Sequence, residues 1–431
     1  MRIIHLLSQL PDRTGSGVYL QSLVREAARA GHDQWVLAAA NQEQEVALPR
    51  LPEERLHLVR FNSERLPFLL PGMSDVMPYP SSRFSQLRGE DLAAYLQAWT
   101  EALERLKETF TPDLVHTNHL WLVSALARQV FATTPMVTSC HGTELRQLDL
   151  APHLADSVLP WAPKIDRVLA LTPPQADQLV RRFGLDRQRV EVMGGAVNTE
   201  LFRPSRGTRS GELQQLTRTR ELDISGRGMR MIYVGKLSQA KGVPSLLDAM
   251  ERLRGRDEAV SLLLVGGGDD EEAREIKARA QAMEGVHLMG HLPQHAVADL
   301  MRACHLLVLP SFFEGLPMVV LEAICCGCRV VVTDLPSMRG WPEPGLVGDG
   351  AMEKVSLPPM RGVDQPEPEG LEPFAARLTD ALALQLERAR QRPLEVDGPR
   401  AVRSLGWQGL FGRLEQRVYR VLVPGGAGGE P

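Results

Sequence analysis

Short apolar runs alternate with amphipathic segments along most of this chain. Apolar runs at 2–7 and 35–40 predict β-strands, and residues 18–30 between them have the 3.6-residue spacing of a helix that ends at Gly31. A long helix is predicted at 92–110, and further strands are predicted at 114–116, 136–140 and 168–172. Strands that are apolar throughout and alternate with helices predict a parallel sheet covered on both faces.

The pattern lapses into polar sequence rich in Gly, Arg and Thr around 198–220, and then it repeats. The second half predicts strands at 229–234, 261–265, 286–289, 306–309 and 329–333, and helices at 243–253, 271–283, 296–303 and 317–326. We therefore predict the fold class α/β, with two similar domains facing across a cleft. The predicted parts are a first domain over 1–200, a linker over 201–228, a second domain over 229–400, and a helix over 405–423 that packs back on the first domain.

Two segments depart from this alternation. Residues 62–90 are rich in Pro and Ser and long for a loop, so they are a candidate lid or acceptor loop. We also hypothesise that this segment makes peripheral contact with a membrane through its apolar residues Leu66, Phe68, Leu69 and Leu70. Residues 358–372 are rich in Pro and Glu and are predicted to form a solvated surface excursion.

Composition narrows the class of protein. Apolar residues make up 43% and charged residues 24% of the 431 residues, which is typical of globular domains. The net charge of −4 gives no indication of a nucleic-acid partner, and no apolar run reaches the roughly 18 residues that cross a bilayer. Five cysteines, three of them within 325–328, suit no disulfide framework and favour buried small residues over metal ligands. We expect a reduced, cytoplasmic chain without a metal site.

Glycine-rich turns follow two predicted strands. Gly15-Ser-Gly17 precedes a helix, but Leu20 stands where a dinucleotide fingerprint needs its third glycine, so a structural turn and a phosphate-binding turn both stay open. The second turn, 266–268, is followed by four acidic residues. Carboxylates at the start of a helix favour a capping role there over phosphate binding.

Lysine is scarce in this chain, and two of its six lysines stand close together. Lys236 and Lys241 follow the predicted strand 229–234, at the sheet edge where ligands approach a parallel sheet. Fixed ammonium groups there could stabilise a leaving diphosphate, whereas solvated surface lysines are the alternative.

The segment 310–322 is the most informative one. Glu314 lies in a loop after a predicted strand, Pro317 suits the first turn of a helix, and Glu322 lies within that otherwise apolar helix. An acid in this place contacts either solvent or a hydroxyl-rich ligand, and the helix N-terminus offers free N–H groups to a phosphate. One place could therefore hold a ribose, a diphosphate and a sugar.

Two segments together resemble the retaining glycosyltransferases of family 4, which have two Rossmann-like domains in the GT-B arrangement. These segments are E-G-L-P-M-V-V-L-E over 314–322 and V-G-K-L-S-Q-A-K-G over 234–242. Residues 195–204 look like that family's crossover into the second domain. Residues 140–144, Cys-His-Gly-Thr-Glu, look like the end of its active-site strand in the first domain.

The resemblance implies a role for each matching residue. Lys236 and Lys241 would hold the donor diphosphate, with Gly17 against it, and Glu322 would accept hydrogen bonds from the ribose hydroxyls. Glu314 and His141 would face the reacting sugar, so the implied catalytic residues are Glu314, His141 and Lys241. Backbone groups of the loop would complete the donor site, from Gly315, Leu316, Met318 and Val319.

Apart from the segment 345–368, which matches the family poorly, this chain departs from the family pattern at three places. Lys236 stands where relatives often have Arg, and lysine cannot make the planar bidentate contact to phosphate that arginine makes. Asn198 replaces the usual Asp of the crossover, and the segment from Asp334 to Gly340 replaces a Gly-Gly turn. The first change affects the donor diphosphate contact, and the last two affect contacts to the acceptor or the nucleotide edge.

We therefore expect a retaining glycosyltransferase that moves a sugar from a nucleoside-diphosphate sugar to an acceptor hydroxyl, without a metal and without a cofactor. The resemblance implies a UDP-sugar first and a GDP-sugar next, and it leaves a lipid, a polysaccharide or a small metabolite open as the acceptor. The alternatives are a nucleotide-sugar epimerase of the same fold and a non-catalytic subunit that binds a sugar nucleotide. A nicotinamide oxidoreductase is a more distant alternative because the glycine fingerprint is incomplete.

Overall fold

A computed structural model of the chain describes residues 1–11, 14–74, 77–205, 209, 228–255, 260–341, 350–392, 394 and 404–424. Its contacts divide the chain into two compact units. Unit 1 comprises Met1–Gly194 together with the segment that starts at Trp407, and unit 2 comprises Gly195–Gly406. Most of the predicted linker, 201–228, lies outside the described residues.

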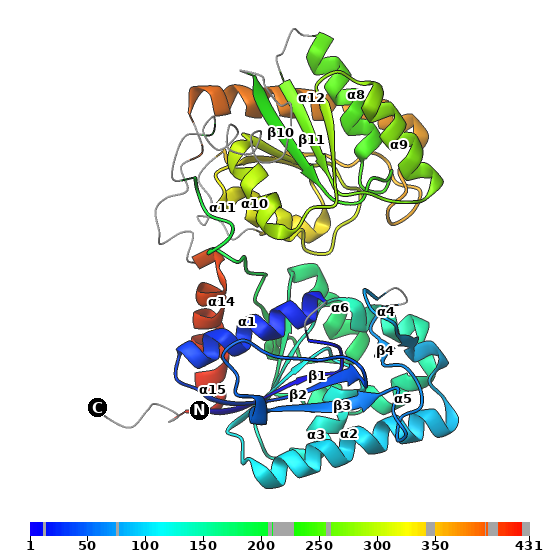
Figure 1. Ribbon diagram of the computed structural model, residues 1–431, viewed down its shortest axis with the longest axis vertical. Coiled ribbons are helices and arrows are strands. Elements are labelled where there is room, and N and C mark those ends of the chain that lie inside the picture. The colour runs from blue at the N-terminus through cyan, green and yellow to red at the C-terminus, as the bar shows by residue number, and fades with distance from the viewer. Residues whose placement is uncertain are drawn as a thin grey trace, which may run out of the picture. The chain divides into compact units, whose positions relative to one another are not determined.

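Unit 1 contains a seven-stranded parallel sheet in the order β3-β2-β1-β6-β7-β8-β9 (Figure 1). Its strands are β1 (Arg2–Leu7), β2 (Asp33–Asn41), β3 (Leu56–Phe61), β6 (Leu114–Asn118), β7 (Met136–Ser139), β8 (Arg167–Ala170) and β9 (Val190–Val192). The chain order reverses between β1 and β6, which is the point where ligands bind in such sheets.

Helices cover both faces of this sheet. In Figure 1, α1 (Gly15–Arg29) and α6 (Pro173–Phe183) lie on one side, and α2 (Gly89–Thr109) and α3 (Leu122–Val130) lie on the other. Central strands are buried on both faces, because β6 and β7 have no exposed residue. The last segment, with α14 (Trp407–Leu414), a π-helical turn at Glu415–Tyr419 and α15 (Arg420–Leu422), packs against α1.

Unit 2 repeats the design with six parallel strands in the order β12-β11-β10-β13-β14-β15. The strands are β10 (Met229–Val234), β11 (Val260–Val265), β12 (Val286–Gly290), β13 (Leu306–Leu309), β14 (Arg329–Thr333) and β15 (Met352–Val355). Its helices are α8 (Val243–Gly255), α9 (Glu271–Ala282), α10 (Gln294–Ala303), α11 (Met318–Cys325) and α12 (Pro368–Gln391). The order reverses between β10 and β13, so the loops after these two strands meet at one edge.

The structure changes two predictions about loops. Residues 361–365 are exposed, as predicted for the surface excursion over 358–372, but the end of that segment is helical because α12 begins at Pro368. The apolar residues of 62–90 do not form an exposed patch. Leu66 and Leu70 are buried, and Phe68 packs against the core of unit 1, so the membrane hypothesis loses the side chains on which it depended.

The five cysteines are all free and buried, as expected for small core residues. Burial raises the pKa of the Cys325 thiol to about 12 and that of Cys328 to about 11, so these thiols stay protonated. Among the described residues, no helix is both long and apolar enough to cross a bilayer.

Candidate active site

The loops after β10 and β13 bring the predicted donor residues of unit 2 together. The two loops are in close contact at Gly242, whose φ of +68° favours glycine. A Cβ at Gly242 would lie 2.0 Å from the carbonyl oxygen of Pro310. The N–H of Phe312 also donates to the carbonyl of Ala240 at 2.9 Å. These contacts fix the position of Lys241 relative to Glu314.

Lys241 and Glu314 form the centre of this cluster. The Lys241 Nζ lies 2.7 Å from Oε1 of Glu314, and the buried Ser311 hydroxyl donates to the same oxygen at 2.7 Å. Both charged side chains are partly buried, with 30% of Lys241 and 17% of Glu314 exposed. Glu314 therefore holds a defined position at the edge of the sheet, with one carboxylate oxygen engaged by two donors. Ser311 is a site residue that the sequence did not identify.

Lys236 has a different partner. Its Nζ lies 2.7 Å from Oδ2 of Asp270, and this hydrogen bond raises the pKa of Lys236 and lowers the pKa of Asp270. Asp270 also caps α9 by accepting the N–H of Ala273 at 2.9 Å, which agrees with the capping role predicted for the acidic turn. Both predicted diphosphate lysines are thus paired with carboxylates.

The ion pair of Lys236 predicts a gain of function in one variant. We expect Asp270→Asn to tighten donor binding about two- to fivefold, because an exposed carboxylate competes only weakly with a diphosphate for Lys236 and because Asn still caps the helix. Isothermal titration with the donor nucleotide measures the change. Asp248→Asn, which removes a carboxylate 2.6 Å from Arg279 within the same unit, is the matched control. An Asp270 variant that binds donor no better than the wild type contradicts a diphosphate role for Lys236.

Glu322 occupies the apolar helix α11 without a partner. Among the described residues, the Glu322 side chain has no hydrogen-bond or ion-pair partner, and burial raises the pKa of its carboxyl to about 7. Leu321 and Ala323 beside it are fully packed. A carboxyl group in this environment is stabilised by hydroxyl groups that donate hydrogen bonds to its oxygens.

The loop before α11 also offers backbone donors, although fewer than the sequence predicts. The N–H of Met318 donates to the carbonyl of Leu316 at 2.9 Å, whereas the N–H of Val319 has no acceptor within the described residues. Gly315 is exposed, and Leu316 is partly exposed. The segment can therefore present N–H groups of Gly315, Leu316 and Val319 to a ligand, whereas the N–H of Met318 is already used.

In unit 1, Gly17 has a structural reason to be glycine. A Cβ there would lie 2.7 Å from the carbonyl carbon of Pro11 and 3.0 Å from the carbonyl oxygen of Leu10. The N–H of Gly17 donates to the Oγ1 of Thr14, which caps α1 at 2.9 Å. Gly17 thus contributes close packing of the turn, and its own N–H is already engaged.

His141 stands two residues after the end of β7 and lies among other polar side chains. Its Nε2 is 3.0 Å from Oδ1 of Asn118, and the amide nitrogen of Asn118 donates to the carbonyl of Leu6 at 3.2 Å. Since Asn118 thereby presents its oxygen, Nε2 of His141 carries the proton and Nδ1 is the acceptor. Burial lowers the pKa of His141 to about 3, with a smaller contribution from His119. The ring is therefore neutral at physiological pH.

A buried carboxylate, Glu144, lies close to this histidine. Glu144 is fully buried and accepts the N–H of Gly142 at 2.8 Å, and its second oxygen lies 3.4 Å from Nδ1 of His119. Burial opposes ionisation of Glu144, but its hydrogen bonds, chiefly with His119, outweigh burial and lower its pKa. The rings of His119 and His141 are 4.8 Å apart. Glu144 and Asn118 are neighbours of the site that the sequence did not assign.

The C-terminal segment reaches the same region through buried hydroxyl groups. His116 contacts the Tyr419 hydroxyl at 2.5 Å through Nδ1 and the Ser139 hydroxyl at 2.8 Å through Nε2. Ser139 then donates to the hydroxyl of Tyr19 at 3.1 Å, and the Tyr19 ring packs edge-on against His141. Tyr419 thereby connects the last helical segment to the surroundings of His141.

Removing the Tyr419 hydroxyl tests this connection. We expect Tyr419→Phe to lower the free energy of unfolding by roughly 1–3 kcal/mol, because the substitution leaves the fully buried Nδ1 of His116 unsatisfied. Chemical denaturation measures the change. Phe411→Leu, an apolar change on the same C-terminal segment, shows what the loss of packing alone costs. A Tyr419 variant as stable as the wild type contradicts the assigned hydrogen bond.

Comparisons with known proteins agree with these observations. A model described as Glycosyltransferase Family 4 matches residues 13–201, and one described as Glycosyl transferases group 1 matches residues 228–354. A D-inositol 3-phosphate glycosyltransferase of Thermomonospora curvata is 26% identical over 94% of this chain and 90% of its own length. The one of Rhodococcus opacus is 28% identical over 75% of this chain and 72% of its own length.

Solved structures have the same fold at lower identity. The sucrose-phosphate synthase of Thermosynechococcus elongatus is 18% identical with a TM-score of 0.61, and the match covers 98% of this chain and all of that one. The Anabaena protein HepE, solved in complex with UDP and glucose, is 18% identical with a TM-score of 0.59 over 96% and 99% of the two chains. The class of protein is thus a glycosyltransferase of the GT-B fold. The chain belongs to glycosyltransferase family 4, of the group 1 type.

Proposed function

We propose that the protein transfers a sugar from a nucleoside-diphosphate sugar to an acceptor hydroxyl, with retention of the anomeric configuration. The observation that carries this proposal is the cluster of Lys241, Glu314 and Ser311 at the β10–β13 edge, with the unpartnered Glu322 on the helix that follows. It combines a cation for phosphate, carboxylates for hydroxyl groups, and backbone N–H groups from one loop.

Each residue then has a task that its surroundings support. Lys241 and Lys236 would neutralise the diphosphate and the charge that develops as it leaves. Glu322 would accept hydrogen bonds from the ribose hydroxyls, and Glu314 would orient the sugar. The neutral His141 would accept a hydrogen bond from a sugar or acceptor hydroxyl at Nδ1. In a retaining reaction the acceptor attacks from the face that the diphosphate leaves, and a diphosphate oxygen takes the acceptor proton.

We propose that this reaction needs no metal, because lysines and loop N–H groups would serve the diphosphate. Activity that is unchanged after dialysis against a chelator supports this part. We favour a UDP-sugar as donor, since the similar HepE was solved with UDP and glucose. We propose the cytoplasm as the place of reaction, since five free and buried cysteines are typical of chains in a reducing compartment.

For the acceptor, we propose a small polar polyol or its phosphate. The names of the relatives support this class, since they are D-inositol 3-phosphate glycosyltransferases at 26–29% identity. A lipid acceptor has less support, because Leu66 and Leu70, on which membrane contact depended, are buried. Transfer assays with inositol phosphate, free inositol and a polyprenyl phosphate distinguish these acceptors.

A thermal-shift screen over nucleotide sugars tests the donor assignment. A bound donor raises the apparent melting temperature by mass action, so one nucleotide sugar should stabilise the wild type and fail to stabilise Glu322→Ala. Incubation of that donor without acceptor then separates a transferase from an epimerase, because only an epimerase converts the donor sugar. If no nucleotide sugar shifts the melting temperature, or if Glu322→Ala is stabilised equally, the donor assignment is wrong.

A further inference from the structure

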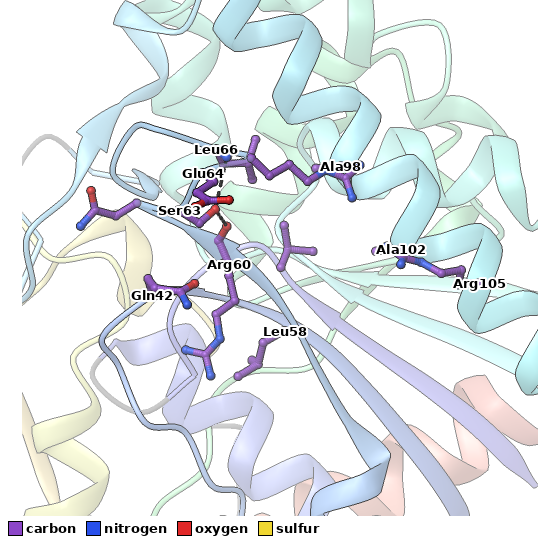
Figure 2. A pocket seen from close by; sticks show the side chains of 12 residues that line it. Gln42, Leu58, Arg60, Ser63, Glu64, Leu66, Ala98, Ala102 and Arg105 are labelled. Atoms are coloured by element: carbon purple, nitrogen blue, oxygen red, sulfur yellow. Dashed lines mark hydrogen bonds between the residues drawn. The ribbon is translucent and has the colours of Figure 1, made fainter.

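Unit 1 contains a cavity that includes none of the predicted site residues. Figure 2 shows it between the edge strand β3, the loop that follows β3, and helix α2. Its volume is about 650 Å³, within the range of roughly 300–1,000 Å³ that is typical of small-molecule pockets. The lining residues are Gln42, Leu58, Val59, Arg60, Asn62, Ser63, Glu64, Arg65, Leu66, Ala98, Ala102 and Arg105.

The sequence explains why this space is open. β3 is the last strand of its sheet, so no neighbouring strand covers its outer edge. Ala98 and Ala102 stand one turn apart on α2 and are too small to fill the space beside it. The loop above is held in shape by Ser63, whose hydroxyl donates to the carbonyl of Arg60 at 2.9 Å and accepts the N–H of Leu66 at 3.2 Å. The cavity is therefore built by ordered residues.

The charged part of the lining consists of three arginines and one carboxylate, Glu64. Arg65 is paired with Glu101, 2.5 Å away, but Arg60 and Arg105 have no carboxylate partner among the described residues. Arg60 uses Nη1 to donate to the carbonyls of Asn41 and Gln44, and Arg105 uses Nε to donate to the carbonyl of Glu101 at 3.3 Å. The other nitrogens of these two guanidinium groups have no acceptor in the part of the chain that the structure describes. Figure 2 shows the two side chains on either side of Leu58.

The lining also has an apolar part, which an inorganic anion would leave unused. Leu66 and Ala98 are buried, and Leu58 and Ala102 are partly exposed towards this space. A ligand that satisfies both parts carries a compact double charge for the guanidinium donors and a carbon skeleton for the apolar surface. A phosphomonoester has this chemistry, since phosphate matches the donor geometry of arginine.

We propose that this cavity is a second small-molecule site, which binds a phosphomonoester of a small organic compound. The site is independent of the proposed donor site, because it lies wholly within 42–105 and shares no residue with it. Binding can therefore be measured without a donor, and failure of either proposal leaves the other unaffected.

Titration calorimetry of the full-length protein tests the site with phenyl phosphate as the probe. We expect saturable binding that is at least tenfold tighter than that of inorganic phosphate, benzoate or benzyl alcohol. Arg105→Gln, which removes one exposed guanidinium, should weaken phenyl phosphate binding about tenfold. Ala102→Leu, which fills the cavity from α2, should abolish it. The melting temperature of each variant shows whether it is folded.

The matched control is Arg181→Gln, which removes an exposed arginine of α6 outside the cavity and should leave binding unchanged. Equal weakening by Arg181→Gln and Arg105→Gln would mean non-specific attraction and would overturn the proposal. Inorganic phosphate or benzoate binding as tightly as phenyl phosphate would overturn the assigned ligand class. The absence of saturable binding to the wild type would overturn the site itself.

Discussion

Lys241→Ala is expected to lower kcat/KM about 10²- to 10³-fold, which is the loss typical when one fixed group that stabilises developing charge is removed. The ammonium of Lys241 is held 2.7 Å from Glu314 by two loops in close contact, so it reaches its working position without reorganisation. Its removal also leaves Glu314 with Ser311 as its remaining side-chain donor. Initial rates at varied donor concentration measure the loss.

The matched control for this experiment is Lys354→Ala. Lys354 is another partly exposed lysine of unit 2, lies on β15 at the end of the sheet, and stands 3.7 Å from Asp334. Its removal should change kcat/KM less than threefold. If Lys241→Ala retains wild-type activity, or if both variants lose activity equally, Lys241 has no specific role in the reaction.

Glu322→Gln is expected to raise stability and to impair donor binding at the same time. The folded-state pKa of this carboxyl is raised from 4.5 to about 7 by burial, so the folded protein binds more protons than the unfolded chain between these values. Stability of the wild type therefore falls as pH rises through this window, by up to about 3 kcal/mol. Glutamine avoids this cost because it is never ionised.

Denaturation at two pH values checks the effect on stability. At pH 8 the Gln variant should be more stable than the wild type by up to about 3 kcal/mol, and at pH 4 the two should be nearly equal. Donor affinity should fall at least tenfold in Glu322→Gln, because an amide replaces one accepting oxygen with a donor. Glu275→Gln, at an exposed position of α9, should change neither property. Equal stability of wild type and Glu322→Gln at pH 8 would contradict an unpaired, buried carboxyl.

Much of the fold could be predicted from apolar periodicity, and the parts that could not share a physical reason. Three short strands were not predicted, namely β3, β9 and β15. They are three to six residues long and lie at the ends of their sheets, where the outer edge of the strand has no neighbouring strand. Such strands lack the continuous apolar run that identifies a central strand. Helix α12 was missed because Pro368 and Pro373 suggest a loop, although Phe374, Leu378, Leu382 and Leu386 recur every four residues on its buried face.

The candidate site shows a similar division. The loop after β13 could be recognised because Glu314, Pro317 and Glu322 lie close together in the chain. The pairing of Lys236 with Asp270 joins residues 34 positions apart and depends on how two loops pack, which spacing does not reveal. Likewise, Gly17 looks like a ligand-binding glycine, but the close approach of Pro11 accounts for it. The sequence thus identified chemistry carried within one segment and missed contacts between segments.

The most direct test of the proposed reaction follows the anomeric proton by NMR while an α-linked UDP-sugar reacts with inositol phosphate. A retaining transferase gives a new glycoside whose first-formed product has the α configuration, and its donor keeps the sugar unchanged when the acceptor is left out. A β-linked product would contradict retention. Conversion of the donor sugar without acceptor would contradict the assignment of this protein as a retaining transferase.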